Sequence, residues 1–108
     1  MLSGYRLMWM LVMFDLPVME SNERKEATGF RNSLLDQGFE MAQFSVYLRY
    51  CTGPEQVETL TQRIQKNLPV GGKVDILCFT DKQYERIVSY SGRKRGPQKK
   101  NPDQYVLF

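Results

Sequence analysis

The chain has 108 residues, of which 42% are hydrophobic and 25% charged, and its formal net charge is +3 at pH 7. These proportions are those of one ordinary globular domain and exclude a disordered, fibrous or multidomain chain. No apolar segment approaches the ~20 residues that a membrane-spanning helix needs, and the run at residues 8–14 is too short for a signal peptide. We therefore expect a soluble, cytoplasmic protein.

The sequence contains no histidine and two cysteines, Cys51 and Cys78. Without histidine there is no Ser-His or Cys-His nucleophile pair and no imidazole metal site. Catalysis would have to rest on carboxylates, tyrosines, lysines, arginines or an oxygen-ligated metal. Both cysteines fall in apolar strand patterns, so we expect buried free thiols rather than a disulfide framework or a zinc site.

Residues 9–14 form a continuous apolar run, which is typical of a central strand buried on both faces. The strand ends at Leu16-Pro17. In the polar stretch that follows, Ser21 or Asn22 can cap a helix. Apolar residues then continue at helical spacing until Gln37-Gly38, which ends the helix.

In FEMAQFSVYLRYC, residues 39–51, the apolar alternation changes phase near Ala42-Gln43. Such a change indicates a bulge or a junction between two strands. Beyond it, polar positions alternate with apolar ones. This polar set is either an ordinary exposed strand face or a platform for nucleic-acid backbone contacts, and it comprises Gln43, Ser45, Tyr47 and Arg49.

A second helix starts at Gly53-Pro54 and stops at Leu68-Pro69. Residues 74–80 then read as a strand too apolar to be half exposed, and Asp81 can cap a short helix over residues 81–90. The terminal YVLF, residues 105–108, is again strand-like.

The order strand, helix, broken strand, helix, strand is that of a ferredoxin-like, split βαβ sandwich, an α+β fold with an antiparallel sheet. Both helices would cover one sheet face. The opposite face carries Trp, Phe and Tyr side chains, so we expect a second copy to cover it, giving a homodimer that associates through the sheet face.

The positive charge is concentrated near the C-terminus. Residues 1–91 hold ten Lys/Arg against eleven Asp/Glu, whereas residues 92–108 hold five against one. We predict a domain over residues 1–91 and a basic C-terminal segment over residues 92–108 that ends in a short strand. The segment is either a solubilising extension or an electrostatic contact to phosphates, made by Arg93, Lys94, Arg95, Lys99 and Lys100.

Asp15 ends the first apolar strand, where a rigid element presents a side chain to a loop. It either caps a turn through an Asx hydrogen bond or binds a ligand. One carboxylate is a poor magnesium site, but two copies of Asp15 facing each other across a two-fold axis could hold a divalent ion and activate a hydroxide. Arg24 and Lys25 oppose the dipole of the following helix, which favours a role outside it, such as holding phosphate, whereas Arg31 is expected to be solvated.

Taken together, these residues resemble a known family, the small ferredoxin-like CRISPR-associated protein two. The similarity covers nearly the whole chain and is carried by MFDLP, ERK, LLDQGF, QFSVY, GGKVDILCFTDKQYERIV and the terminal VLF. The chain looks most like the version found beside the CRISPR effector that is a single large protein.

The resemblance implies a homodimer that bridges two copies of the CRISPR integrase subunit during spacer acquisition, an antiviral function. It also implies a magnesium-dependent endonuclease acting on RNA or DNA, with Asp15 as metal ligand and catalytic residue. The family's arginine after the loop corresponds to Arg24, and its strand-junction Gln and Ser to Gln43 and Ser45. Phe14 stands where many members have Tyr.

Two alternatives to the nuclease remain open from sequence. One is a non-catalytic scaffold that binds duplex DNA through Lys25, Gln43, Ser45 and the basic segment and does not need Asp15. The other is a regulatory domain that binds a metabolite between protomers, for which Gly71-Gly72 is only a weak phosphate-loop signal. Because no base-reading motif is present, we expect mainly backbone contacts and steeply salt-dependent binding.

Overall fold

The computed structural model describes residues 7–92. Three helices and four strands follow in the order β1 (Met8–Asp15), α1 (Ser21–Asp36), β2 (Glu40–Gln43), β3 (Val46–Cys51), α2 (Pro54–Lys66), β4 (Lys73–Thr80) and α3 (Asp81–Glu85). This order confirms the predicted α+β, split βαβ arrangement. The last helix is shorter than expected, since it ends at Glu85. The predicted homodimer stays a prediction.

The sheet has the order β2-β3-β1-β4, and every neighbouring pair is antiparallel. β1 is therefore central, as predicted. Within residues 7–92, β4 pairs with β1 only, and its apolar side chains are less covered than the sequence suggested. Leu77 is 43% exposed, and Cys78 is exposed rather than buried.

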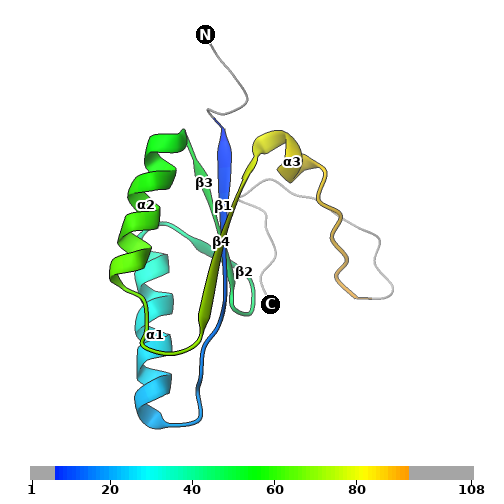
Figure 1. Cartoon of the computed structure of the whole chain (residues 1–108). Helices are drawn as coiled ribbons and strands as arrows, with labels where there is room; N and C mark the ends of the chain where they lie inside the picture. Colours follow the sequence, from blue (N-terminus) through cyan, green and yellow to red (C-terminus); the bar gives the residue numbers. More distant parts are fainter. Residues whose placement is uncertain (1–6, 93–108) are drawn as a thin grey trace.

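α1 and α2 cover one face of the sheet (Figure 1). Beneath them lies a hydrophobic core to which every second residue of β1 contributes, because side chains alternate between the faces of a strand. The core residues that this layer buries are Met10, Val12, Phe14, Phe30, Leu34, Phe39, Tyr47, Cys51, Leu60 and Ile64.

The opposite face, called the open face below, carries a second, smaller cluster of buried residues, which comprises Trp9, Ala42, Leu48 and Tyr84. There α3 packs Tyr84 on Trp9, with ring centroids 4.0 Å apart, and the edge of Tyr50 meets the same indole at 5.0 Å. Further along β1, Met13 is 39% exposed. Outside the buried cluster, the open face of residues 7–92 keeps exposed apolar side chains such as Met13 and Leu77, which agrees with the bare face that the sequence predicted.

The residue that precedes α1 and the one that precedes α3 differ from the sequence prediction, whereas α2 begins at Gly53-Pro54 as predicted. Glu20, rather than Ser21 or Asn22, precedes α1, and its backbone N–H donates to Oε1 of Glu23 at 3.0 Å. Thr80, rather than Asp81, precedes α3 and accepts a 3.1 Å hydrogen bond from the N–H of Gln83. Asp81 is instead the first residue inside α3.

The phase change at residues 42–43 has both predicted causes. β2 carries a register irregularity between Met41 and Gln43, and a turn separates it from β3. The predicted polar face of β3 is wrong for Tyr47, which is 3% exposed and stacks on Phe14 at 5.7 Å. The reason is register, because Tyr47 pairs with Val12 and therefore faces the helices.

Candidate functional site

Asp15 is the last residue of β1 and is exposed. It pairs in register with Lys73 of β4. Within residues 7–92, no group donates a hydrogen bond to its carboxylate and no cation forms an ion pair with it. The Asx turn that was the alternative interpretation is therefore not formed with any of these residues. The carboxylate is available to a ligand.

The backbone of Asp15 is held rigidly by the loop between α2 and β4. Gly72 has φ +87°, and a Cβ at this residue would lie 2.5 Å from the carbonyl oxygen of Asp15. Only glycine fits such a close approach in this conformation. The same loop is tied to α1, because the N–H of Val70 donates to Oε1 of Glu26 at 2.9 Å. Asp15 thus sits on a fixed frame, as a catalytic or ligand residue requires.

The β2–β3 turn lies directly beside the end of β1. The N–H of Phe14 donates to the carbonyl oxygen of Ser45 at 3.0 Å, so Ser45 is adjacent to the residue that precedes Asp15. Ser45 has φ +63°, the left-handed region that residues other than glycine rarely adopt. Gln43, at the other side of the turn, is exposed. The structure therefore brings Ser45 close to Asp15, whereas Gln43 pairs with Val46 and lies one strand further away.

Sequence reasoning missed Phe44, which lies between these two residues. Its side chain is 77% exposed. In the sequence, Phe44 shares an apolar alternation with Val46, Leu48 and Tyr50 and is therefore predicted to be a strand residue. The signal that could have found it is its position inside the phase change, where a turn replaces the strand.

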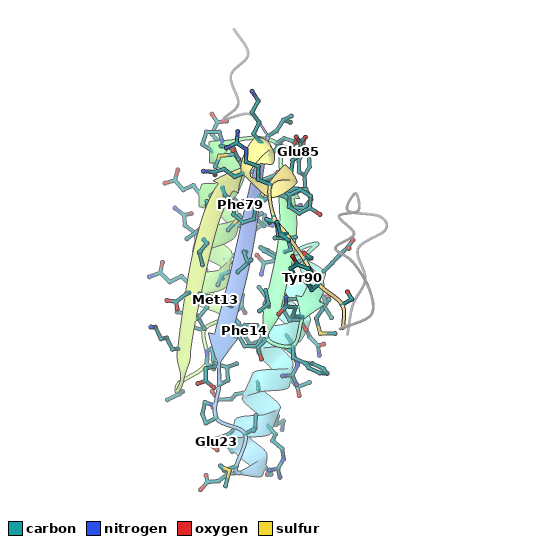
Figure 2. All side chains as sticks on the ribbon, turned by 90° about the vertical axis from the view of Figure 1, so that its right-hand side faces the viewer. Met13, Phe14, Glu23, Phe79, Glu85 and Tyr90 are labelled. Carbon is teal, nitrogen blue, oxygen red and sulfur yellow. The ribbon has the colours of Figure 1, made fainter. Side chains whose placement is uncertain are left out.

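Arg24 occupies the first turn of α1, and its side chain forms hydrogen bonds with the loop that precedes the helix. Its Nη1 donates to the carbonyl oxygens of Val18 and Met19 at 3.1 and 2.9 Å. In Figure 2 the neighbouring Glu23 lies well beyond the end of β1 that Phe14 marks. No contact between Arg24 and Asp15 occurs in the described chain. The exposed Lys25 also lies in this turn, and neither cation is placed against the carboxylate.

A second carboxylate on the open face escaped the sequence prediction. Asp75 pairs in register with Met13, so it lies on the same side of the sheet as Asp15. Its own partner is Lys73, at an N–O distance of 3.7 Å between exposed groups. Such a surface ion pair contributes little to stability and leaves both charges accessible.

Among residues 7–92, no cluster of three or more Asp, Glu or Cys side chains could hold a metal ion. One chain offers Asp15 as a hard, exposed oxygen ligand, which is the type that magnesium prefers, but a single carboxylate is too few. The donor set fits a divalent ion only if a second copy contributes its own Asp15.

The other predicted phosphate contacts, Arg93, Lys94, Arg95, Lys99 and Lys100, lie outside the described residues, as does the terminal YVLF. Within the described part of the chain, no helix has the length and apolarity to cross a membrane.

Comparison with protein-family models matches residues 8–87 to the family described as CRISPR associated protein Cas2. A protein of Paracidovorax avenae named CRISPR-associated endoribonuclease Cas2 is 65% identical over 108 residues, the full length of both chains. A protein of the same name from Flavobacterium psychrophilum is 44% identical and covers 99% of this chain and 93% of its own. Another, from Parvibaculum lavamentivorans, is 43% identical over 94% of this chain and 100% of its own.

Proposed function

This chain belongs to the CRISPR associated protein Cas2 family, and from that premise we propose that it is a magnesium-dependent endonuclease that hydrolyses phosphodiester bonds. The relatives named above are called endoribonucleases, so RNA is the first substrate to test. The observation that carries the proposal is the exposed carboxylate of Asp15, which has no partner within residues 7–92 and stands on a rigid strand end.

The active unit in this proposal is a homodimer associated through the open face. That face bears apolar side chains that a monomer leaves in water, and covering them would supply hydrophobic free energy for association. Asp15 lies at the margin of the same face, because it is two residues after Met13 in β1 and alternate residues of a strand share a face. A two-fold axis near the end of β1 would therefore bring two Asp15 carboxylates together.

Two carboxylates at such an axis would repel each other unless a cation lay between them. A magnesium ion held by the two Asp15 carboxylates would act as a Lewis acid and would make a water molecule a better nucleophile. The role of Asp15 is to hold and orient the ion. The frame formed by Gly72 and the Ser45 turn keeps the carboxylate in place, so little reorganisation is needed when substrate binds.

The remaining predicted residues act on the substrate backbone. Ser45 lies beside the end of β1 and Gln43 lies at the other side of the same turn, and both can hydrogen-bond phosphate or sugar oxygens. Arg24 uses one nitrogen for the loop, and its Nε and Nη2 have no partner within residues 7–92, so its charge can still offset that of a phosphate. Lys25 and the cations of residues 93–100 would add sequence-independent attraction that falls with salt.

The biological role we propose is CRISPR spacer acquisition, in which the homodimer binds nucleic acid and bridges copies of the integrase subunit. A non-catalytic scaffold that binds duplex DNA is the second candidate. It is favoured by one observation, that Arg24 bonds its own loop and does not contact Asp15. A scaffold would not need Asp15, and the two candidates therefore differ in the effect of changing this residue.

The experiment is cleavage of labelled RNA and duplex DNA by purified dimer, with magnesium and with chelator. We compare the wild type with Asp15→Asn, which removes the charge and keeps the shape. Asp36→Asn, an exposed carboxylate at the other end of α1, is the matched control. The proposal expects magnesium-dependent cutting that Asp15→Asn alone abolishes. Absence of cutting by every variant would support the scaffold.

A further inference from the structure

Phe44 is an aromatic side chain held in water. It is 77% exposed, whereas three other phenylalanines, Phe14, Phe30 and Phe39, are 7% exposed or less. An isolated exposed apolar residue is ordinary on a protein surface. Phe44 differs because the next residue, Ser45, is hydrogen-bonded to Phe14, the residue that precedes Asp15.

The turn that carries Phe44 is rigid and strained. The next residue, Ser45, has φ +63°, and its carbonyl accepts the 3.0 Å hydrogen bond from Phe14. A residue with a side chain is held in the left-handed region only when its surroundings enforce it, and such residues concentrate at functional sites. The register irregularity in β2 just before the turn also directs the chain here.

The turn also lies near Asp15. Phe44 directly precedes Ser45, and Asp15 directly follows Phe14. Because Ser45 and Phe14 are hydrogen-bonded, the Cα atoms of Phe44 and Asp15 lie within about 15 Å of each other. A nucleic-acid strand with a phosphate at Asp15 therefore has neighbouring nucleotides within reach of the Phe44 ring.

We propose that Phe44 is a substrate-binding residue whose ring stacks on an unpaired base of the strand that the Asp15 site cleaves. The proposal rests on the nuclease function proposed above and identifies a contact that would position the scissile phosphate. Stacking on an aromatic ring accepts any base, because every base has a π face. A base inside a duplex already has neighbours on both faces, so this contact selects an unpaired nucleotide.

The first test measures affinity for a fluorescent single-stranded oligoribonucleotide of mixed sequence in the presence of chelator, which separates binding from cutting. Phe44→Ala is expected to raise the dissociation constant about 10-fold, as is typical for loss of one stacked base. Phe44→Leu keeps the apolar character without the ring and should weaken binding similarly. Phe44→Tyr should retain near wild-type affinity. Equal affinity of all four proteins would overturn the proposal.

The second test removes a base from the RNA, whereas the first removes the aromatic ring from the protein. A series of oligoribonucleotides, each with one abasic position, is bound to the wild type and to Phe44→Ala. At the stacked position, the abasic change should weaken binding to the wild type and have no further effect on Phe44→Ala. Fully additive losses at every position would contradict stacking.

Two controls distinguish base stacking from a role of the ring in dimerisation and from failure of the nuclease function itself. Sedimentation at the same concentrations shows whether Phe44→Ala remains dimeric, since loss of the dimer would assign the ring to the interface between copies and overturn the proposal. The nuclease assay on Asp15→Asn is independent of this test. Retained cutting by Asp15→Asn refutes the proposed function, whereas unchanged RNA affinity of Phe44→Ala refutes only the stacking contact.

Discussion

The indole nitrogen of Trp9 donates a 2.9 Å hydrogen bond to the carboxylate of Asp81, which joins the start of β1 to the first residue of α3. Trp9 is 3% exposed, so this bond provides a partner for a donor removed from water. Together with the stacking of Tyr84 on the indole, it fixes α3 over one end of the open face. The other end, where Asp15 lies, is left uncovered by α3.

Asp81→Ala should lower the free energy of unfolding by about 1–3 kcal/mol, because the buried indole N–H loses its acceptor. Lys82→Ala, a change at the exposed next residue of the same helix, should stay within about 0.5 kcal/mol of the wild type. Urea unfolding followed by the fluorescence of the single tryptophan measures both variants. Equal stability of the two variants would show that the bond contributes nothing.

The stability of the protein should fall at alkaline pH partly because of Tyr50. Burial, and after it the carboxylate of Asp81, raises the pKa of the Tyr50 phenol above its ordinary value of 10.0. The folded state thus holds this proton more tightly than the unfolded state. Its contribution is fully present below the ordinary value and is lost as pH rises through the higher folded value.

Tyr50→Phe removes this linkage, so the stability of the variant should decline less steeply with pH than that of the wild type above about pH 10. An ultraviolet absorbance titration checks the cause. In Asp81→Ala the pKa of Tyr50 should move toward its ordinary value and still remain raised, because burial is the larger cause. Parallel stability curves for wild type and Tyr50→Phe would contradict the linkage.

Gly72→Ala should lower the free energy of unfolding by about 1–3 kcal/mol, since a Cβ at φ +87° would meet the carbonyl oxygen of Asp15. The displacement of Asp15 should also reduce metal-dependent cleavage. Gly29→Ala is the matched control, because nothing lies within 4 Å of its Cβ position in α1. That variant should gain up to about 1 kcal/mol from helix propensity. Greater stability of Gly72→Ala than of Gly29→Ala would refute the close approach.

The two thiols should react at very different rates. Burial raises the pKa of both, but Cys78 is exposed on the edge strand whereas Cys51 is 0% exposed. A thiol reagent at neutral pH should modify Cys78 in the folded protein and Cys51 only after unfolding. The folded Cys78→Ser variant should therefore react very slowly with the thiol reagent. Rapid modification of this variant would contradict the burial of Cys51 in the core.

Hydrophobic periodicity was sufficient to predict the fold. The apolar run of β1 and the helical stripes of α1 and α2 are local patterns, and the split βαβ order leaves few ways to arrange them. The exposure of β4 was not predictable from the same patterns. Leu77 and Cys78 are as apolar as central-strand residues, and only the strand order and register show that β4 is the last strand of the described sheet and that Leu77, opposite Leu11, lies on the open face.

The candidate site was predicted in part. Asp15 could be recognised because an acid at the end of an apolar strand is unusual. Gln43 and Ser45 could be recognised because they are polar positions at the strand junction and match residues of the family that the chain resembles. The sequence could not show that Ser45 bonds Phe14 or that Gly72 closes on Asp15, since these contacts join segments far apart in the chain. Phe44 was missed for a related reason, because alternation alone does not distinguish a turn residue from a strand residue.

The central claim is that one active site is built from two copies of Asp15, and subunit mixing tests it most directly. Wild-type and Asp15→Asn chains are mixed in varying proportion, dissociated and reassociated, and the rate of magnesium-dependent RNA cleavage is measured. If both carboxylates are needed, an equal mixture contains about one quarter active dimers, and the rate falls as the square of the wild-type fraction. A rate that falls in direct proportion to that fraction would contradict the shared site.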